Sequence, residues 1–287
     1  MKKNSISMLI VVYNKKLQES ITLNSLLGFE NRIDNLLIVN NGPKEIELNC
    51  NILKDIRHKH NNIELQNCTE NKPLSWIYND FTNKYETELF VFFDDDTPIS
   101  YDFEKTLFSL TNTDVELPKI FAVSDSVQYY PLVDETVWKH KSEIDSNCCV
   151  FSIGSGLTIS NNIVNEFKKN NIELFDSRFA LYGVDTSFFR RLNFLNNKGA
   201  SFKITSYTKL DHSLSRTEGK ISQWRYIERL YDAVLSIKYY QKLKLLRVLK
   251  LCLRNIYSLK FLKIIIKTYI VGSHPRCQNG KVKTKCH

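Results

Sequence analysis

The sequence predicts an α/β fold followed by a group of basic helices. Two apolar runs, Ile6–Val12 and Leu89–Phe93, have the length and the β-branched or aromatic content of strands buried on both faces. After the first run, Leu17–Leu27 carries apolar residues at helical spacing, and Leu36–Val39 is a second short strand. Strand, helix and strand at this spacing form a βαβ unit, which builds a sheet with parallel strands.

The alternation of strands and helices continues through the first 220 residues. We expect, in chain order, a short strand at 63–65, helices at 76–81 and 101–110, a strand at 120–123, strand-like arms on both sides of Gly154 and Gly156, a helix beginning near Asp185, and a strand at 201–207. Residues 124–147 show no clear period, and we assign them no element.

The composition fits one large domain, or one domain with an appendage. The chain has 287 residues, of which 43% are hydrophobic, so a sizeable core can form. Its seven cysteines contain no C-x-x-C pair, which favours reduced thiols and a cytoplasmic location. We expect no membrane-spanning helix, because no stretch offers 18 uncharged apolar residues. The short apolar run after Lys2 and Lys3 is better explained as a strand than as a signal peptide.

The charges divide the chain in two. The net charge is +9, yet residues 241–287 contain 12 Lys/Arg and no Asp/Glu, whereas residues 1–240 contain 28 Lys/Arg and 31 Asp/Glu. We therefore predict a body at residues 1–220 and a basic, helical region at residues 221–287.

Three helices are expected in the basic region. Apolar residues at helical spacing from Ile221 to Ile237 predict the first. Between residues 242 and 267 the cations do not keep to one helical face, which predicts two helices with a break near Asn255–Ser258.

Two kinds of partner would suit the basic region. Basic helices rich in Leu, Ile, Phe and Tyr bind anionic membrane surfaces, with about 1 kcal/mol of attraction per basic residue near the surface. The alternative is a helical subdomain packed against the body or against another subunit. Nucleic acid is not an expected partner, because the sequence has no recognition motif for it.

Three consecutive carboxylates, Asp94, Asp95 and Asp96, directly follow the second apolar run. Pro98 ends that strand, because proline has no N–H to donate to a neighbouring strand. The carboxyl end of a central strand is where open α/β sheets bind ligands. Adjacent carboxylates repel one another, and a divalent cation such as Mg²⁺ or Mn²⁺ with a polyphosphate would offset that repulsion. The alternative is an acidic turn with solvated side chains.

Other polar residues fall at the ends of expected elements. Tyr13 follows the first strand, and Asn40 follows the second. Lys72 could reach a diphosphate from its loop, and a solvated loop lysine is the alternative. Asp185 lies near a helix start, where a carboxylate is favoured, so a simple N-cap is its alternative role. His212 follows a strand and could bind a metal or a diphosphate, or only hydrogen-bond its own loop.

Short motifs occur in a fixed order along residues 5–215. They read Val11-Val12-Tyr13-Asn14, Val39-Asn40-Asn41-Gly42-Pro43, Asp94-Asp95-Asp96, Tyr182-Gly183-Val184-Asp185-Thr186-Ser187-Phe188-Phe189-Arg190 and Lys209-Leu210-Asp211-His212. Together they resemble the motifs of family 2 glycosyltransferases of the bacterial surface-polysaccharide type. The resemblance has two departures: Asn40 stands where the family has Asp, and Val184 stands where it has Glu.

The resemblance implies a nucleotide-diphosphosugar transferase (GT-A) fold with a mixed central sheet. It implies a metal-dependent, inverting hexosyl- or deoxyhexosyltransferase that uses Mn²⁺ or Mg²⁺. It also implies these roles: Asp185 as catalytic base, Val12, Tyr13, Asn40, Asp94 and Asp95 as donor-binding residues, and Asp96 and His212 as metal ligands. Lys72 joins the candidate donor-binding residues because of its own place in the loop before the expected helix at 76–81. The departure at Asn40 affects nucleotide identity most, and the departure at Val184 affects acceptor choice.

The expected donor is a UDP- or dTDP-sugar, and the expected acceptor is a glycan or lipid-linked molecule in surface-polysaccharide synthesis. The expected location is the cytoplasm, with peripheral attachment to the inner face of the membrane through the basic region. Two other functions stay open. A nucleotidyltransferase would need a Gly-rich loop after the first strand, and Tyr13-Asn14-Lys15-Lys16 has no glycine. A non-catalytic, membrane-associated sugar-binding protein would not need Asp185.

Overall fold

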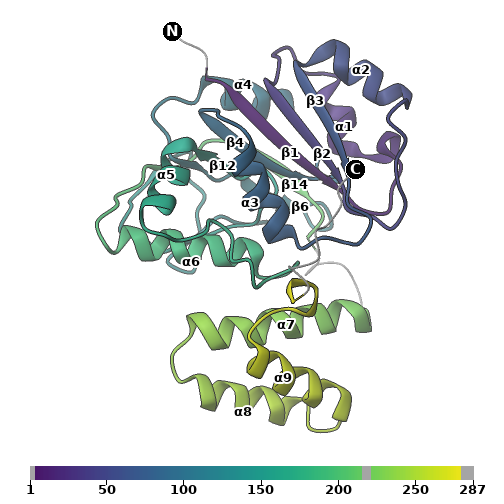
Figure 1. Ribbon diagram of the computed structural model, residues 1–287. Helices are drawn as coiled ribbons and strands as arrows, with labels where there is room; N and C mark the ends of the chain where they lie inside the picture. The colour runs from purple at the N-terminus through teal and green to yellow at the C-terminus, as the bar shows by residue number, and fades with distance from the viewer. Residues whose placement is uncertain (1–3, 215–220, 279–287) are drawn as a thin grey trace.

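A mixed sheet forms the centre of the molecule (Figure 1). The computed structural model describes residues 4–214 and 221–278. Within these residues the main sheet has eight strands in the order β10-β13-β5-β12-β4-β1-β2-β3. The strands of this sheet are β1 (Ile6–Val12), β2 (Asn35–Asn40), β3 (Asn62–Asn67), β4 (Leu89–Asp94), β5 (Val115–Glu116), β10 (Ser142–Ile144), β12 (Thr158–Ser160) and β13 (Ile204–Ser206). The predicted α/β class with a mixed central sheet is confirmed.

The strands that carry the candidate site are parallel and end together. β3, β2, β1 and β4 run in one direction, and β12 runs antiparallel to β4. The register places Val11 opposite Asp94 and Val12 opposite Asn40. The residues that follow β1, β2 and β4 therefore leave the sheet at one edge, next to one another.

Helices cover both faces of this sheet (Figure 1). The helices are the 3₁₀ turns η1 (Leu17–Glu19) and η2 (Pro275–Cys277), and α1 (Ile21–Leu26), α2 (Asn51–Lys59), α3 (Leu74–Lys84), α4 (Tyr101–Ser109), α5 (Asn161–Lys169), α6 (Val184–Asn196), α7 (Gln223–Tyr240), α8 (Lys244–Arg254) and α9 (Leu259–Val271). Side chains alternate along β1, so Leu9 and Val11 join the core with α3, α5 and α6, while Met8 and Ile10 join the core with α1, α2 and α4.

Three short stretches differ from the sequence-based expectation. The helix expected at Leu17–Leu27 is interrupted at Ser20, whose side chain accepts a hydrogen bond from the Leu23 N–H and so caps α1. Helices α2 and α5 were not expected. Each buries only three hydrophobic residues, which is too short a stripe to stand out in the sequence.

Most of the short strands between residues 119 and 151, together with residues 209–212, form two smaller sheets. The strand expected at 120–123 is β6 (Lys119–Ala122), which lies between β14 (Lys209–His212) and β7 (Gln128–Tyr130) and outside the main sheet. The second small sheet consists of β8 (Leu132–Val133), β9 (Thr136–Val137) and β11 (Val150–Phe151). The unassigned residues 124–147 thus hold several strands, too short to show a period of two.

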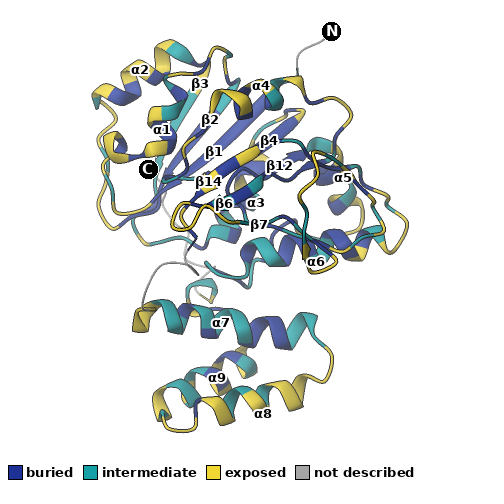
Figure 2. Ribbon diagram, turned by 180° about the vertical axis from the view of Figure 1, so that it is seen from behind, coloured by how far each residue is buried: buried dark blue, intermediate teal, exposed yellow. Residues whose placement is uncertain are grey.

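The basic region forms a layer of three helices beside the body (Figures 1 and 2). α7 lies nearest the body, and α8 and α9 are separated by a break at residues 255–258, as predicted. Leu230 and Val234 of α7 and Ile265 of α9 form a small separate core. Among the helices of residues 4–214 and 221–278, none combines the length and the apolar character needed to cross a bilayer. The boundary predicted between residues 220 and 221 adjoins a segment outside the described residues and stays a prediction.

Candidate active site

A cavity of about 740 Å³ opens where β1 and β4 end. Its size is in the range of small-molecule sites. It brings together six of the nine residues singled out from the sequence: Tyr13, Asp94, Asp95, Asp96, Asp185 and His212. Val12, Asn40 and Lys72 are outside its lining.

Asp94, Asp96 and His212 form a cluster that could hold a metal ion. One potential ligand atom from each residue lies within 4.8 Å of the others. Asp96 Oδ1 is buried and accepts no hydrogen bond from any residue in the described part of the chain. The Thr97 hydroxyl lies 2.8 Å from His212 Nδ1 and orients the imidazole ring. Two carboxylates and an imidazole are a donor set that fits Mn²⁺ or Mg²⁺.

Burial, together with the negative charges crowded at this cluster, shifts the pKa of Asp94. Burial and the neighbouring charges of Asp96 and Asp95 raise the pKa of Asp94 to about 6, although His212 and Lys15 act in the opposite direction. A divalent cation would relieve this repulsion, which is a second reason why the cluster suits one.

Asp95 has a different position from its two neighbours. One of its oxygens accepts the backbone N–H of Tyr13 at 3.1 Å, and the other pairs with Lys15 Nζ at 2.5 Å. Its backbone carbonyl also accepts the hydroxyl of Ser20. Asp95 therefore holds the loop that follows β1 against the end of β4 and so shapes the cavity wall.

Asp185 lies in the first turn of α6 and faces the cavity. Gly183, with φ 84°, occupies the N-cap position, so Asp185 is not the cap. The Asp185 carboxylate accepts the backbone N–H of Gly154. Burial and the charge of Asp94 nevertheless raise the pKa of Asp185 to about 7, with a smaller contribution from Asp232. A carboxyl group with this pKa can accept and release a proton near neutral pH.

The three remaining residues lie close to the cavity but serve the surrounding structure. Val12 is fully buried in β1. The Asn40 side chain donates to Lys44 O and to Asn67 Oδ1, and it accepts the N–H of Gly42. Lys72 pairs with Asp80 at 2.7 Å.

Asn41, the residue after Asn40, is the one from this turn that lines the cavity. Asn41 lines the cavity and Asn40 does not, because successive side chains leave a strand end in opposite directions.

The sequence-based prediction missed an entire wall of the cavity. α7 contributes Trp224, Arg225, Arg229 and Asp232 to the lining. Arg225, Arg229 and Asp232 follow helical spacing, so they share one face of α7 beside its apolar stripe. This row of charged residues is visible in the sequence and could have suggested a functional face of the helix. The sequence around it does not indicate that this face lies opposite Asp185. Burial raises the pKa of Asp232.

Arg276, near the end of the described chain, also reaches this wall. Its guanidinium donates to Asn71 Oδ1 and to Glu228 Oε2, each at 2.7 Å. His274 Nε2 lies 3.3 Å from the same Glu228 carboxylate. These contacts connect the loop before α3, helix α7 and the segment after α9 around one side of the cavity.

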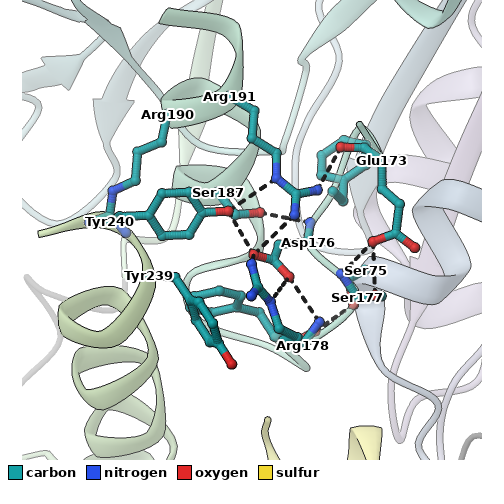
Figure 3. Close-up of polar contacts among 12 residues, drawn as sticks. Ser75, Glu173, Asp176, Ser177, Arg178, Ser187, Arg190, Arg191, Tyr239 and Tyr240 are labelled. Atoms are coloured by element: carbon teal, nitrogen blue, oxygen red, sulfur yellow. Dashed lines mark hydrogen bonds and ion pairs between the residues drawn. The ribbon is translucent and has the colours of Figure 1, made fainter. Parts of the chain in front are cut away.

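A buried carboxylate, Asp176, attaches α7 to the body (Figure 3). Arg178 donates to both of its oxygens, at 2.7 and 2.5 Å, and Arg191 of α6 lies 3.1 Å from Oδ2. From α7, the Tyr240 hydroxyl donates to the same Oδ2 at 2.6 Å. The position of α7, and with it the cavity wall, therefore depends on this network.

Comparison with known proteins bears on the fold. No protein-family model matches the sequence, and a search of curated proteins finds no similar sequence. Among solved structures, S. aureus TarS matches with a TM-score of 0.55 and 17% identity, over 89% of this chain and 44% of TarS. TarS residues 1–349 in complex with UDP-GlcNAc match with a TM-score of 0.55 and 16% identity, over 98% of this chain and 76% of that chain. The complex of the same TarS residues with UDP gives a TM-score of 0.54 and 16% identity, over 97% and 75%. This chain thus spans less than half of the longer TarS chain, and it has the nucleotide-diphosphosugar transferase (GT-A) fold.

Proposed function

We propose that this protein is a metal-dependent, inverting glycosyltransferase of the family 2 type. The observation that carries the proposal is the arrangement of one cavity. The Asp94, Asp96 and His212 cluster lies in it together with Asp185, a separate carboxylate whose pKa is raised to about 7. A metal-dependent, inverting transfer of a sugar from a nucleotide to a hydroxyl group needs both a site for a metal-bound diphosphate and a site for a base.

In the proposed reaction the protein's residues do three things. Asp94, Asp96 and His212 would hold the cation, which when bound would neutralise the charge on the donor's diphosphate. Tyr13 and Asn41 line the part of the cavity beside them, where the nucleotide would lie. Asp185 takes the proton from the acceptor hydroxyl while the oxygen of that hydroxyl bonds to the anomeric carbon of the sugar. The bond from that carbon to the diphosphate breaks on the opposite side, so the configuration inverts.

The donor we propose is a UDP-sugar, with a dTDP-sugar as the alternative. The TarS complexes with UDP and UDP-GlcNAc, which share the fold, support uridine. The proposed acceptor is a glycan or lipid-linked molecule in surface-polysaccharide synthesis. A lipid-linked acceptor would make attachment to the inner face of the cytoplasmic membrane useful.

The test is a screen of nucleotide-sugars with Mn²⁺ or Mg²⁺, in which the release of nucleoside diphosphate is measured with candidate acceptors. We expect one UDP- or dTDP-sugar to be turned over, and we expect Asp185→Asn to lower the rate of transfer by about 10²–10⁴-fold. Calorimetry should show that Asp185→Asn still binds the nucleotide. Asp55→Asn, an exposed change on α2, is the matched control and should keep full activity.

Three outcomes would contradict the proposal. If no nucleotide-sugar binds, the cavity has another ligand. Binding without turnover by the wild-type protein would favour a non-catalytic sugar-binding protein. Release of pyrophosphate from a nucleoside triphosphate and a sugar phosphate would favour a nucleotidyltransferase.

A further inference from the structure

Helix α8 leaves a row of leucines in solvent. Leu245, Leu246, Leu249 and Leu253 are 76%, 62%, 56% and 59% exposed. At about 100° per residue they span an arc of about 100° on the helix. The adjoining arc of α8, with Val248, Leu251 and Cys252, packs against the small core that α8 shares with α7 and α9. The exposed leucines therefore extend the apolar side of α8 beyond the arc that the described chain covers.

The turn after α8 extends this apolar surface. Ile256 is 53% exposed, Tyr257 is fully exposed at 101%, and Leu259 at the start of α9 is 76% exposed. In Figure 2, α8, most of which is coloured as exposed, lies on the side of the helix layer that faces away from the body. A continuous apolar surface of this kind is uncommon on a soluble monomer and marks an interaction site.

The charges around the leucines indicate what the partner is. Arg247, Lys250 and Arg254 fall on the arc of α8 next to the exposed leucines. Within residues 233–278 there is no Asp or Glu, whereas α9 adds Lys260, Lys263 and Lys267. A second copy of this face would bring cations against cations, which is unfavourable at an interface. An anionic lipid surface offers both the negative charge and the apolar interior that this face lacks.

We propose that this docking face, made of Leu245, Leu246, Leu249, Leu253, Ile256 and Tyr257 with Arg247, Lys250 and Arg254 beside them, inserts into an anionic phospholipid surface. The leucines would enter the boundary between headgroups and acyl chains, and the cations would contact lipid phosphates. The proposal specifies the peripheral attachment proposed above, but it depends on α8 and not on catalysis.

Docking through α8 would also orient the cavity. α7 lies between α8 and the body (Figure 1), and its other side supplies Trp224, Arg225 and Arg229 to the cavity wall. One helix layer would therefore separate the lipid surface from the cavity wall.

The experiment is co-sedimentation of the full chain with vesicles, without donor or metal. Vesicles of phosphatidylcholine alone are compared with vesicles containing about 30% phosphatidylglycerol. We expect binding to the anionic vesicles that weakens with salt. We expect at least a tenfold loss of binding in Leu249→Ser/Leu253→Ser and in Lys250→Glu/Arg254→Glu. Lys54→Glu/Lys105→Glu, on exposed positions of the body, changes the net charge equally and should keep most of the binding.

Thermal unfolding of each variant checks that it is folded. Because these side chains are exposed, we expect each variant to keep the melting temperature of the wild-type protein. A loss of vesicle binding would then come from the changed surface and not from unfolding. The proposal is overturned if the wild-type chain does not bind anionic vesicles, or if the α8 variants bind as well as it does. It is also overturned if light scattering shows an oligomer that the leucine variant dissociates, because the face would then be a subunit interface. None of these results bears on glycosyl transfer, which is measured separately.

Discussion

At the scale of single residues, the cavity places a carboxyl group in an environment that opposes its ionisation. Burial and the charge of Asp94 raise the pKa of Asp185 to about 7, and the N–H of Gly154 offsets only part of this effect. The folded protein thus accepts a cost in stability at a position where the proposed chemistry needs a base, as is common at functional sites.

Asp185→Asn should therefore stabilise the protein at alkaline pH. Because the folded-state pKa is raised above the unfolded value, the folded form binds more protons between about pH 4 and pH 7, and stability falls as the pH rises through that window. Asn carries no charge and avoids this loss. We expect a gain on the order of 2–4 kcal/mol at pH 8 that shrinks toward pH 5. Urea denaturation in the presence of EDTA, at pH 5 and at pH 8, measures this gain in the free energy of unfolding. A gain that is equal at pH 5 and pH 8 would show that ionisation of Asp185 is not the cause.

Gly154 is the residue that leaves room for this carboxylate. A Cβ at position 154 would lie 2.7 Å from Asp185 Oδ1, so Gly154→Ala should turn the carboxylate away. A displacement of about 1 Å can cost about 100-fold in rate, so we expect a 10–100-fold slower transfer with unchanged nucleotide affinity. Gly28→Ala is the control, since its Cβ would meet only Ser25 O, at 3.4 Å. Full activity of Gly154→Ala would refute the positioning of Asp185 by this turn.

At the scale of elements, the junction between α6 and α7 decides the shape of the cavity. Burial works to raise the pKa of Asp176, but the hydrogen bonds and charges of Arg178, Arg191 and Tyr240 outweigh it, and the pKa is lowered. A lowered folded-state pKa contributes stability above the unfolded pKa of about 4, which is lost as the pH falls through the folded value.

Asp176→Asn should be strongly destabilising at neutral pH. It removes the charge shared by two arginines and a tyrosine, and breaking such a buried pair costs about 3–5 kcal/mol. Tyr240→Phe removes one hydrogen bond to a charged group and should cost about 1–3 kcal/mol. Chemical denaturation at pH 7 and pH 4 measures both, and the penalty for Asp176→Asn should be smaller at pH 4. Tyr257→Phe, at a fully exposed site, should leave stability unchanged. Equal effects of all three changes would show that Asp176 does not hold α7.

At the scale of the whole molecule, the candidate site joins two parts with different charge. The body supplies the acidic edge of the sheet, and the basic region supplies a wall of the cavity and the outward face of α8. The body is nearly balanced in charge and the basic region is not, so the two ends of the molecule are suited to different partners.

Divalent metal and nucleotide together should stabilise the folded chain. A ligand that binds only the folded form at 100 times its dissociation constant adds about 2.7 kcal/mol. We expect Mn²⁺ with UDP to raise the melting temperature of the wild-type protein, and EDTA to reverse the rise. Asp96→Asn and His212→Ala should lose most of the response, while Asp55→Asn should keep it. An undiminished response in both cluster variants would show that the metal binds elsewhere.

Much of the fold could be predicted from local patterns. The apolar runs of β1 and β4 are visible in the sequence because buried parallel strands are apolar on both faces. The break at residues 255–258 could be predicted because the lysines and arginines before it and after it would lie on different faces of one continuous helix. Strands of two or three residues, such as β8 and β9, are too short for any period to show.

The sequence by itself determined that three carboxylates follow a buried strand and that Asp185 begins a helix some ninety residues later. Only the tertiary structure decided that these groups share one cavity, that Asn41 and not Asn40 lines it, and that α7 forms its wall. The physical reason is that spacing along a chain sets which face of its own element a side chain occupies. Which other element that face meets depends on packing between residues far apart in the chain, such as Asp176 with Tyr240.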